Sequence, residues 1–147
     1  MGWLFLWAFL DKLFGFGFAT LPEQAWLNGG SPTTGFFQFA TRGPFASAFQ
    51  RLAGNSLVDW VFMLSLLLLG LTLILGIGVR IAGYGGAILV FLMYLALLPP
   101  ENNPFLDDHI IYVLILLGLT TTKAGHWLGL GDWWVNTELV QKYPILE

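Results

Sequence analysis

The sequence contains no cysteine and few charged residues. Without cysteine, the chain forms no disulfide and offers no thiol nucleophile, no thiolate zinc ligand and no iron–sulfur ligand. Only 10% of its 147 residues are charged, against about 25% in soluble domains. The net charge of −3 also argues against the basic surface that nucleic-acid binding needs. We therefore expect neither a soluble domain nor a nucleic-acid-binding protein.

Apolar residues make up 56% of the chain, with thirteen Phe and seven Trp, and the mean hydropathy is +0.73. Long apolar runs with Trp and Phe at their ends are typical of membrane spans and their interfacial aromatic belts. We predict one all-α domain, residues 1–147, built as an integral membrane four-helix bundle with the lipid bilayer as its partner. The predicted spans are residues 2–20, 58–79, 82–98 and 109–128.

The loop between the first two spans, residues 21–57, is predicted to carry two short interfacial helices. Ser31 is expected to cap a helix near Pro32–Thr41, and a second helix is expected near Pro44–Ala53. Two interpretations stay open: the helices cap the bundle, or they form a lid over a site between the spans.

The first span carries Asp11 and Lys12 near its centre. Adjacent residues point about 100° apart on a helix, so the two charges do not simply neutralise each other. Such charges are expected to face protein rather than lipid, and we predict an ion pair between Asp11 and Lys123. The polar residues predicted to lie at a similar depth are Thr72 in the second span and Thr120, Thr121 and Lys123 in the fourth. This polar layer is either a structural clamp or the floor of a quinone or small-molecule pocket, or part of a proton path.

The two histidines lie on one span, about 25 Å apart along its axis. His109 and His126 therefore do not share a metal ion, and we predict no metal site. Asp107 and Asp108 precede the fourth span, where carboxylates cap free N–H groups. His109 is a candidate for proton transfer or for contact with a quinone carbonyl.

Arg80 and Lys123 lie on one side of the predicted topology, and the acidic loop 101–108 lies on the other. By the positive-inside tendency, this places both termini on the cytoplasmic side of a multi-pass protein of the cell membrane. Arg80 either anchors its loop at phospholipid headgroups or belongs to a site.

Five segments resemble the DoxX family of small four-span membrane proteins in its archaeal form. They are FLWAFLDKLFGFGFAT (Phe5–Thr20), AWLNGGSPTTGFF (Ala25–Phe37), GPFASAF (Gly43–Phe49), DWVFMLSLLLLGLTLILGIGVRIA (Asp59–Ala82) and the run NPFLDDHIIY…AGHWLGLGDWW (Asn103–Trp134). The family is named with the DoxD/DoxA subunits of an archaeal thiosulfate:quinone oxidoreductase. The resemblance implies a four-helix membrane bundle and quinone-linked electron transfer.

The resulting hypothesis is a membrane subunit of a redox system, linked through quinone to the oxidation of thiosulfate or another sulfur compound. It predicts no intrinsic cofactor other than quinone, and a partner redox subunit or a homo-oligomer. The candidate catalytic residues are Asp11, Lys12 and His109, and the candidate substrate- or quinone-binding residues are Arg80, Asp108, Thr120, Thr121 and Lys123. The alternative is a non-catalytic structural or assembly subunit; a small transporter is less favoured because no inverted repeat is visible.

Overall fold

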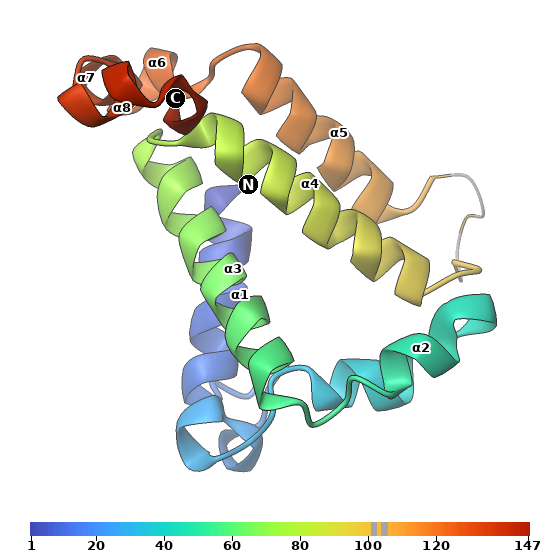
Figure 1. Ribbon diagram of the computed structural model, residues 1–147. Helices are drawn as coiled ribbons and strands as arrows, with labels where there is room; N and C mark the ends of the chain where they lie inside the picture. Colours follow the sequence, from blue (N-terminus) through green and yellow to red (C-terminus); the bar gives the residue numbers. More distant parts are fainter. Residues whose placement is uncertain (101–102, 104–105) are drawn as a thin grey trace.

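The computed structural model describes residues 1–100, 103 and 106–147, and all regular elements in those residues are helical. This confirms the all-α prediction. Within those residues, four helices exceed ten residues: α1 (Gly2–Phe14), α3 (Ser56–Leu75), α4 (Val79–Ala96) and α5 (Asp108–Thr121) (Figure 1). Each lies inside or close to one of the predicted spans.

The first helix ends at Phe14, so the prediction that it continues to residue 20 is wrong. Gly15 follows in the left-handed conformation, with φ of 70°, and its amide donates to the Asp11 carbonyl at 2.8 Å. Gly17 also has a positive φ, of 85°. Residues with a Cβ avoid this region, and glycine there is a common helix terminator. Residues 15–20 are apolar enough to continue a span, so composition alone did not predict the turn.

The long helices form two antiparallel pairs, α1 with α3 and α4 with α5, rather than an evenly closed bundle (Figure 1). Glycines allow the close approach within each pair. A Cβ on Gly70 would lie 2.8 Å from the Leu6 amide nitrogen, and one on Gly83 would overlap Thr120. Gly70 therefore permits close contact between α1 and α3.

The two pairs meet where α3 turns into α4 and diverge toward the opposite end (Figure 1). Gly76 and Gly78 make the turn in left-handed conformations, with φ of 72° and 62°. The buried cluster beside this junction joins all four helices through Phe5, Leu66, Leu69, Ala82, Ala87, Val90 and Leu116. Toward the far end, a cavity is lined by residues of α1, the first loop, α3 and α4.

The first loop closes that far end. It contains η1 (Pro22–Gln24), η2 (Trp26–Asn28), the π-helical turn η3 (Phe36–Ala40), η4 (Gly43–Phe45) and α2 (Ala46–Gln50). Ser31 Oγ accepts from the Thr34 amide at 3.2 Å, but η3 starts at Phe36 with Gly35 as its N-cap and without a side-chain cap, so the predicted helix Pro32–Thr41 with Ser31 as its cap is wrong. The Arg42 amide donates to the Ala96 carbonyl at 2.9 Å, so the loop reaches from the α1/α3 pair to the end of α4.

Four short elements follow α5 and pack at the junction: α6 (Gly125–Leu128), α7 (Gly131–Val135), α8 (Glu138–Lys142) and η5 (Pro144–Leu146) (Figure 1). The Leu130 amide donates to the Leu75 carbonyl at 2.8 Å. Gly76, Gly125 and Gly129 approach so closely that side chains would not fit between them. The predicted span 109–128 is therefore a helix that ends at Thr121, followed by a turn and the short α6.

In the described part of the chain, two helices, Ser56–Leu75 and Val79–Ala96, are long and apolar enough to cross a membrane. Only 28% and 39% of their apolar windows are buried, whereas the core helix of a soluble protein is mostly buried. α1 and α5 have 13 and 14 residues, fewer than the about 20 that span a bilayer without help. Four crossings therefore stay a prediction.

Candidate functional site

The predicted site residues lie in three separate places. Asp11 and Lys12 lie at the far end of α1, and Arg80, Thr120, Thr121 and Lys123 meet at the α3–α4 junction. Asp108 and His109 start α5, next to residues 101–105, of which only 103 is described.

Asp11 is buried, with 2% of its surface exposed, and its partners are backbone amides. Its Oδ2 accepts from the Ala19 amide at 3.0 Å and its Oδ1 from the Phe18 amide at 3.4 Å. The carboxylate thus fastens the turn after Gly15 to the end of α1. The predicted pair with Lys123 is wrong, because the turn supplies the donors and Lys123 bonds elsewhere. Asp11 has a structural role here.

Lys12 continues the inward-facing stripe of α1. It lies seven residues after Phe5 and three after Phe9, so it shares their face, and Phe5 and Phe9 belong to the core or pack on it. At the level of Lys12 the helix pairs have diverged, and the residue lines a cavity of about 260 Å³, named here the Lys12 cavity. The described residues offer the Lys12 ammonium no hydrogen bond; Asp11 is the opposite charge that acts on it.

The rest of the Lys12 cavity is apolar apart from Thr33. Its aromatic and aliphatic lining comes from the first loop, α3 and α4: Phe36, Phe37, Phe49, Phe62, Leu89 and Leu92. The rings of Phe37 and Phe49 stack with their centroids 6.0 Å apart. An ammonium among apolar and aromatic side chains suits a ligand with a flat apolar body and an oxygen acceptor.

Asp59 holds the loop over this cavity, a role that sequence reasoning missed. This carboxylate, 6% exposed, accepts from Ser31 Oγ at 2.9 Å and from Thr33 Oγ1 at 2.5 Å. In the sequence, Asp59 has only the appearance of an acid in the first turn of a helix, where carboxylates are common. A cluster of three hydroxyl residues, Ser31, Thr33 and Thr34, was the available signal for a buried acceptor.

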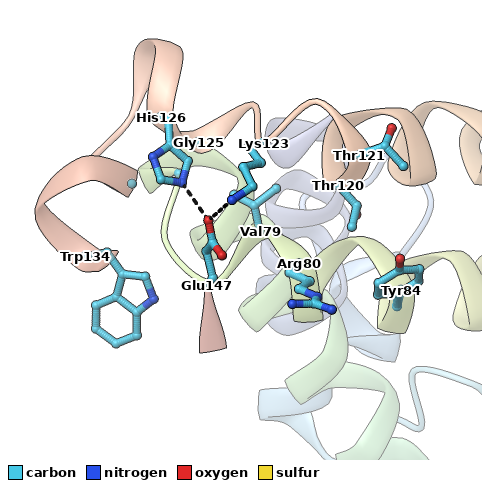
Figure 2. A pocket seen from close by; sticks show the side chains of 12 residues that line it. Val79, Arg80, Tyr84, Thr120, Thr121, Lys123, Gly125, His126, Trp134 and Glu147 are labelled. Atoms are coloured by element: carbon cyan, nitrogen blue, oxygen red, sulfur yellow. Dashed lines mark hydrogen bonds and ion pairs between the residues drawn. The ribbon is translucent and has the colours of Figure 1, made fainter. Parts of the chain in front are cut away.

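The second cavity, of about 310 Å³, lies between the start of α4, the end of α5 and the C-terminal elements (Figure 2). We name it the Arg80 cavity. Its polar lining comprises Arg80, Tyr84, Thr120, Thr121, Lys123, His126, Trp134 and Glu147. Thr120 and Thr121 donate their hydroxyl hydrogens to backbone carbonyls of α5 at 3.0 Å, so their oxygens only accept from a ligand. Thr72 bonds within α3 and lines a different cavity.

Glu147 is the centre of the polar contacts in the Arg80 cavity (Figure 2). Its Oε1 lies 2.6 Å from Lys123 Nζ and 3.3 Å from His126 Nε2. The His126 ring is oriented from its other side by Asp132, at 2.7 Å. The hydrogen bond from Lys123, with the charges of Lys123 and His126, lowers the pKa of the Glu147 carboxyl below its ordinary value.

Two backbone features fix this arrangement. Lys123 has a φ of 50°, a left-handed conformation that costs a residue with a Cβ about 1–2 kcal/mol. The tail is held independently, because the Arg80 amide donates to the Glu147 carbonyl at 3.0 Å and Trp134 Nε1 donates to the Leu146 carbonyl at 2.7 Å. Among the residues described, no hydrogen bond or ion pair involves the exposed Arg80 guanidinium.

The start of α5 is a capping site, as predicted for Asp107. Its Oδ1 accepts from the His109 amide at 2.9 Å and contacts the His109 ring nitrogen Nδ1. Although partial desolvation acts to raise it, these hydrogen bonds lower the pKa of the Asp107 carboxyl overall. His109 is thus tied to its own helix start and lines neither cavity named above.

The predicted polar layer does not form, because Lys12 and Lys123 lie at opposite ends of the helix pairs. The Lys12 cavity reaches Leu92 on α4, twelve residues from Arg80, which is about 18 Å along a helix. Sequence reasoning also missed Glu147, Tyr84 and Trp134, which distant parts of the chain bring to the Arg80 cavity without a local motif. In the part of the chain that the structure describes, no three His, Cys, Asp or Glu residues are grouped to hold a metal ion.

Comparisons with protein-family models, with curated proteins and with solved structures found no match to this chain.

Proposed function

We propose that the chain is a small multi-pass membrane protein that binds the head of a quinone in the Lys12 cavity and serves as a subunit of a redox system. Large apolar side chains lie on the outer faces of all four long helices, for example Leu68, Ile88 and Leu114, which are 57%, 63% and 61% exposed. Apolar surface of this extent needs lipid or protein cover. The exposed apolar surface supports four membrane crossings. The shorter helices α1 and α5 would be accommodated by tilt or by flanking residues.

The observation that carries the proposal is Lys12 in an otherwise largely apolar, phenylalanine-lined cavity. Ligand cavities commonly measure about 300–1,000 Å³, so 260 Å³ suits a ring-sized head whose apolar tail continues into lipid. The Lys12 ammonium, for which the described residues provide no acceptor, can donate to a carbonyl oxygen, and its charge favours negative charge that develops on that oxygen. Phe36, Phe37 and Phe49 are placed to pack on the ring.

The redox part of the proposal is supported by the resemblance to the DoxX family. Quinone supplies a two-electron carrier when bound, and a partner redox subunit supplies the electrons. The Arg80 cavity lies at the opposite end of the helix pairs from the Lys12 cavity, so it does not adjoin a quinone bound beside Lys12. We therefore propose that the partner oxidises the sulfur compound and that this chain provides the quinone site.

The chain ends support the proposed topology. Gly2 packs against Gly70 and Ile74 near the end of α3, and Glu147 bonds to the Arg80 amide. Both termini of the chain therefore lie at the Arg80 end of the molecule (Figure 1). Under the positive-inside tendency this is the cytoplasmic end, and the Lys12 cavity opens toward the outer half of the cell membrane.

Purification in a mild detergent, followed by mass spectrometry of bound lipids, tests the quinone proposal. We expect quinone to co-purify with the wild-type chain and with Lys142→Met, which removes an exposed lysine of α8. Lys12→Met, which keeps the length of the apolar stem, should reduce bound quinone about tenfold because one charge-assisted hydrogen bond is lost. Equal quinone content in all three proteins, each folded by circular dichroism, would refute the proposal.

A non-catalytic assembly subunit is the second candidate, and one observation favours it. Trp7, Phe16 and Phe18 form an exposed aromatic cluster beside the end of α1, with centroid distances of 5.8 Å and 5.4 Å from Trp7. Such a cluster suits contact with another membrane chain. A stoichiometric complex that depends on Trp7 and Phe18, contains no quinone and keeps its activity in Lys12→Met would support this candidate.

A further inference from the structure

We propose that the Arg80 cavity is a phosphate oxyanion site, and that the Glu147 carboxylate fills the anion position in the present conformation. The anion chemistry is shared by the headgroup of an anionic lipid and by free phosphate. This inference does not depend on quinone binding, because the two cavities share no lining residue.

The first argument is the position of the Glu147 carboxylate and the groups that it contacts. A single oxygen, Oε1, faces both Lys123 Nζ and His126 Nε2, at 2.6 Å and 3.3 Å (Figure 2). Lys123 Nζ makes a short charge-assisted hydrogen bond of the kind that binds oxyanions, and His126 Nε2 lies within ion-pair distance of the same oxygen. His126 is held in place by Asp132, so its Nε2 is directed into the cavity when Nδ1 contacts that carboxylate.

The second argument is the surplus of positive charge. Among the side chains that line the cavity, Arg80 and Lys123 carry two positive charges against one negative charge on Glu147, before any protonation of His126. Asp132 touches His126 but does not line the cavity. The Arg80 guanidinium makes no ion pair with the described residues, and its planar fork suits bidentate binding of phosphate. The Lys123 side chain is 64% exposed, so an incoming anion reaches it.

The third argument is that the tail does not need the Glu147 side chain to stay docked. The Arg80 amide and the Trp134 indole bind backbone carbonyls of residues 147 and 146. The carboxylate can therefore leave the two cations while the tail stays in place. Glu147 thus acts as a displaceable internal anion that competes with a phosphate.

The surroundings favour a lipid as one source of that phosphate. Trp127, Leu128 and Trp133 flank the cavity on α6 and α7 and are 82%, 99% and 63% exposed. Exposed Trp beside cationic side chains marks the headgroup level of a membrane. A headgroup phosphate at this level would reach Arg80 and Lys123 from the bilayer side.

Histidine-selective ¹⁵N labelling gives a direct readout, because the chain has only two histidines. His126 reports on the cavity, and His109, at the start of α5, is the internal control. Purified protein in a neutral detergent is titrated with potassium phosphate at constant ionic strength. The wild type is compared with the single variant Glu147→Gln. Two double variants combine Glu147→Gln with Lys123→Met or with Arg80→Met. A control double variant combines Glu147→Gln with Lys142→Met.

We expect phosphate to shift the His126 signals and not those of His109, with about tenfold tighter binding in Glu147→Gln than in the wild type, the equivalent of one charge-assisted contact. Adding Lys123→Met or Arg80→Met should reverse that gain, and adding Lys142→Met should not. Equal phosphate affinity in Glu147→Gln and its Lys123→Met double variant would overturn the proposal.

A second arm separates the two sources of phosphate. The same His126 shifts are compared in phosphatidylcholine nanodiscs with and without phosphatidylglycerol. A response of Glu147→Gln to phosphatidylglycerol, lost with Lys123→Met, assigns the site to a lipid headgroup; a response to inorganic phosphate alone assigns it to the free anion. No response to either, in protein that keeps its wild-type circular dichroism, overturns the site.

Discussion

The Asp11 carboxylate accepts a hydrogen bond from the Ala19 amide at 3.0 Å, eight residues further along the chain. This contact explains the buried acid near the end of the apolar helix α1: the carboxylate fastens the returning turn to that helix. We predict that Asp11→Ala lowers the free energy of unfolding by about 1–3 kcal/mol, because the Phe18 and Ala19 amides lose their acceptor. Denaturant titration in detergent measures this.

Glu23→Ala is the matched control, because Glu23 is an exposed carboxylate in η1, shortly after the turn that Asp11 fastens. It should change the unfolding free energy by less than about 0.5 kcal/mol. Equal stability of the Asp11→Ala and Glu23→Ala variants would contradict the capping role.

Gly70 and Gly118 are helical glycines with opposite surroundings. A Cβ on Gly70 would press on the backbone of Leu6, whereas one on Gly118 meets nothing within 4 Å. Gly70→Ala should therefore destabilise the α1–α3 pair by about 1–3 kcal/mol. Gly118→Ala should be neutral or stabilising by up to about 1 kcal/mol, since alanine is the better helix former. The same denaturant titration compares them, and a stabilising Gly70→Ala would contradict the packing.

Because Lys123 has a left-handed backbone conformation, two variants that both remove its ammonium should differ in stability. Lys123→Gly relieves the backbone cost, and Lys123→Met keeps it, so the glycine variant should be more stable by about 1 kcal/mol. Thermal unfolding of the two purified variants measures this. A methionine variant at least as stable as the glycine variant would show that residue 123 does not hold a positive φ.

The docked tail should respond to acid through Glu147. Its pKa is lowered in the folded protein from an ordinary value of 4.5, so the carboxylate stabilises docking above that pH. The stabilisation is lost as pH falls through the lower folded-state pKa. The protection factors of the Arg80 amide and the Trp134 indole, which allow for the pH dependence of intrinsic exchange, should therefore decrease as the pH drops below 4.5, although both hydrogen bonds to the tail backbone still form. Glu147→Gln should remove this acid dependence, and Glu138→Gln should keep it.

Composition and periodicity were enough to predict an all-α chain and the approximate positions of its long helices, because apolar runs determine both. They were not enough to predict where α1 ends. Residues 15–20 are apolar enough to continue a span, and only the spacing of Gly15 and Gly17 signals the turn that returns to Asp11.

The candidate site was only partly predictable, because its residues are brought together by turns that the composition of the chain does not show. Lys12 stood out as a charge within an apolar run, and it lines a cavity inside the protein. Its cavity partners Phe36 and Phe49 come from a loop whose position depends on the contacts of Asp59. Depth counting placed Lys123 near Asp11 because it assumed four full crossings, whereas α1 and α5 are shorter.

Photo-crosslinking with an azido-quinone tests the central claim most directly. Labelled peptides are mapped by mass spectrometry in the wild type, Lys12→Met and Lys142→Met, with and without excess unmodified quinone. The account predicts adducts around Phe36, Phe37 and Phe49 that excess quinone suppresses and that Lys12→Met reduces, while Lys142→Met keeps them. Adducts confined to the lipid-facing surfaces or to the Arg80 cavity, unchanged in Lys12→Met, would contradict it.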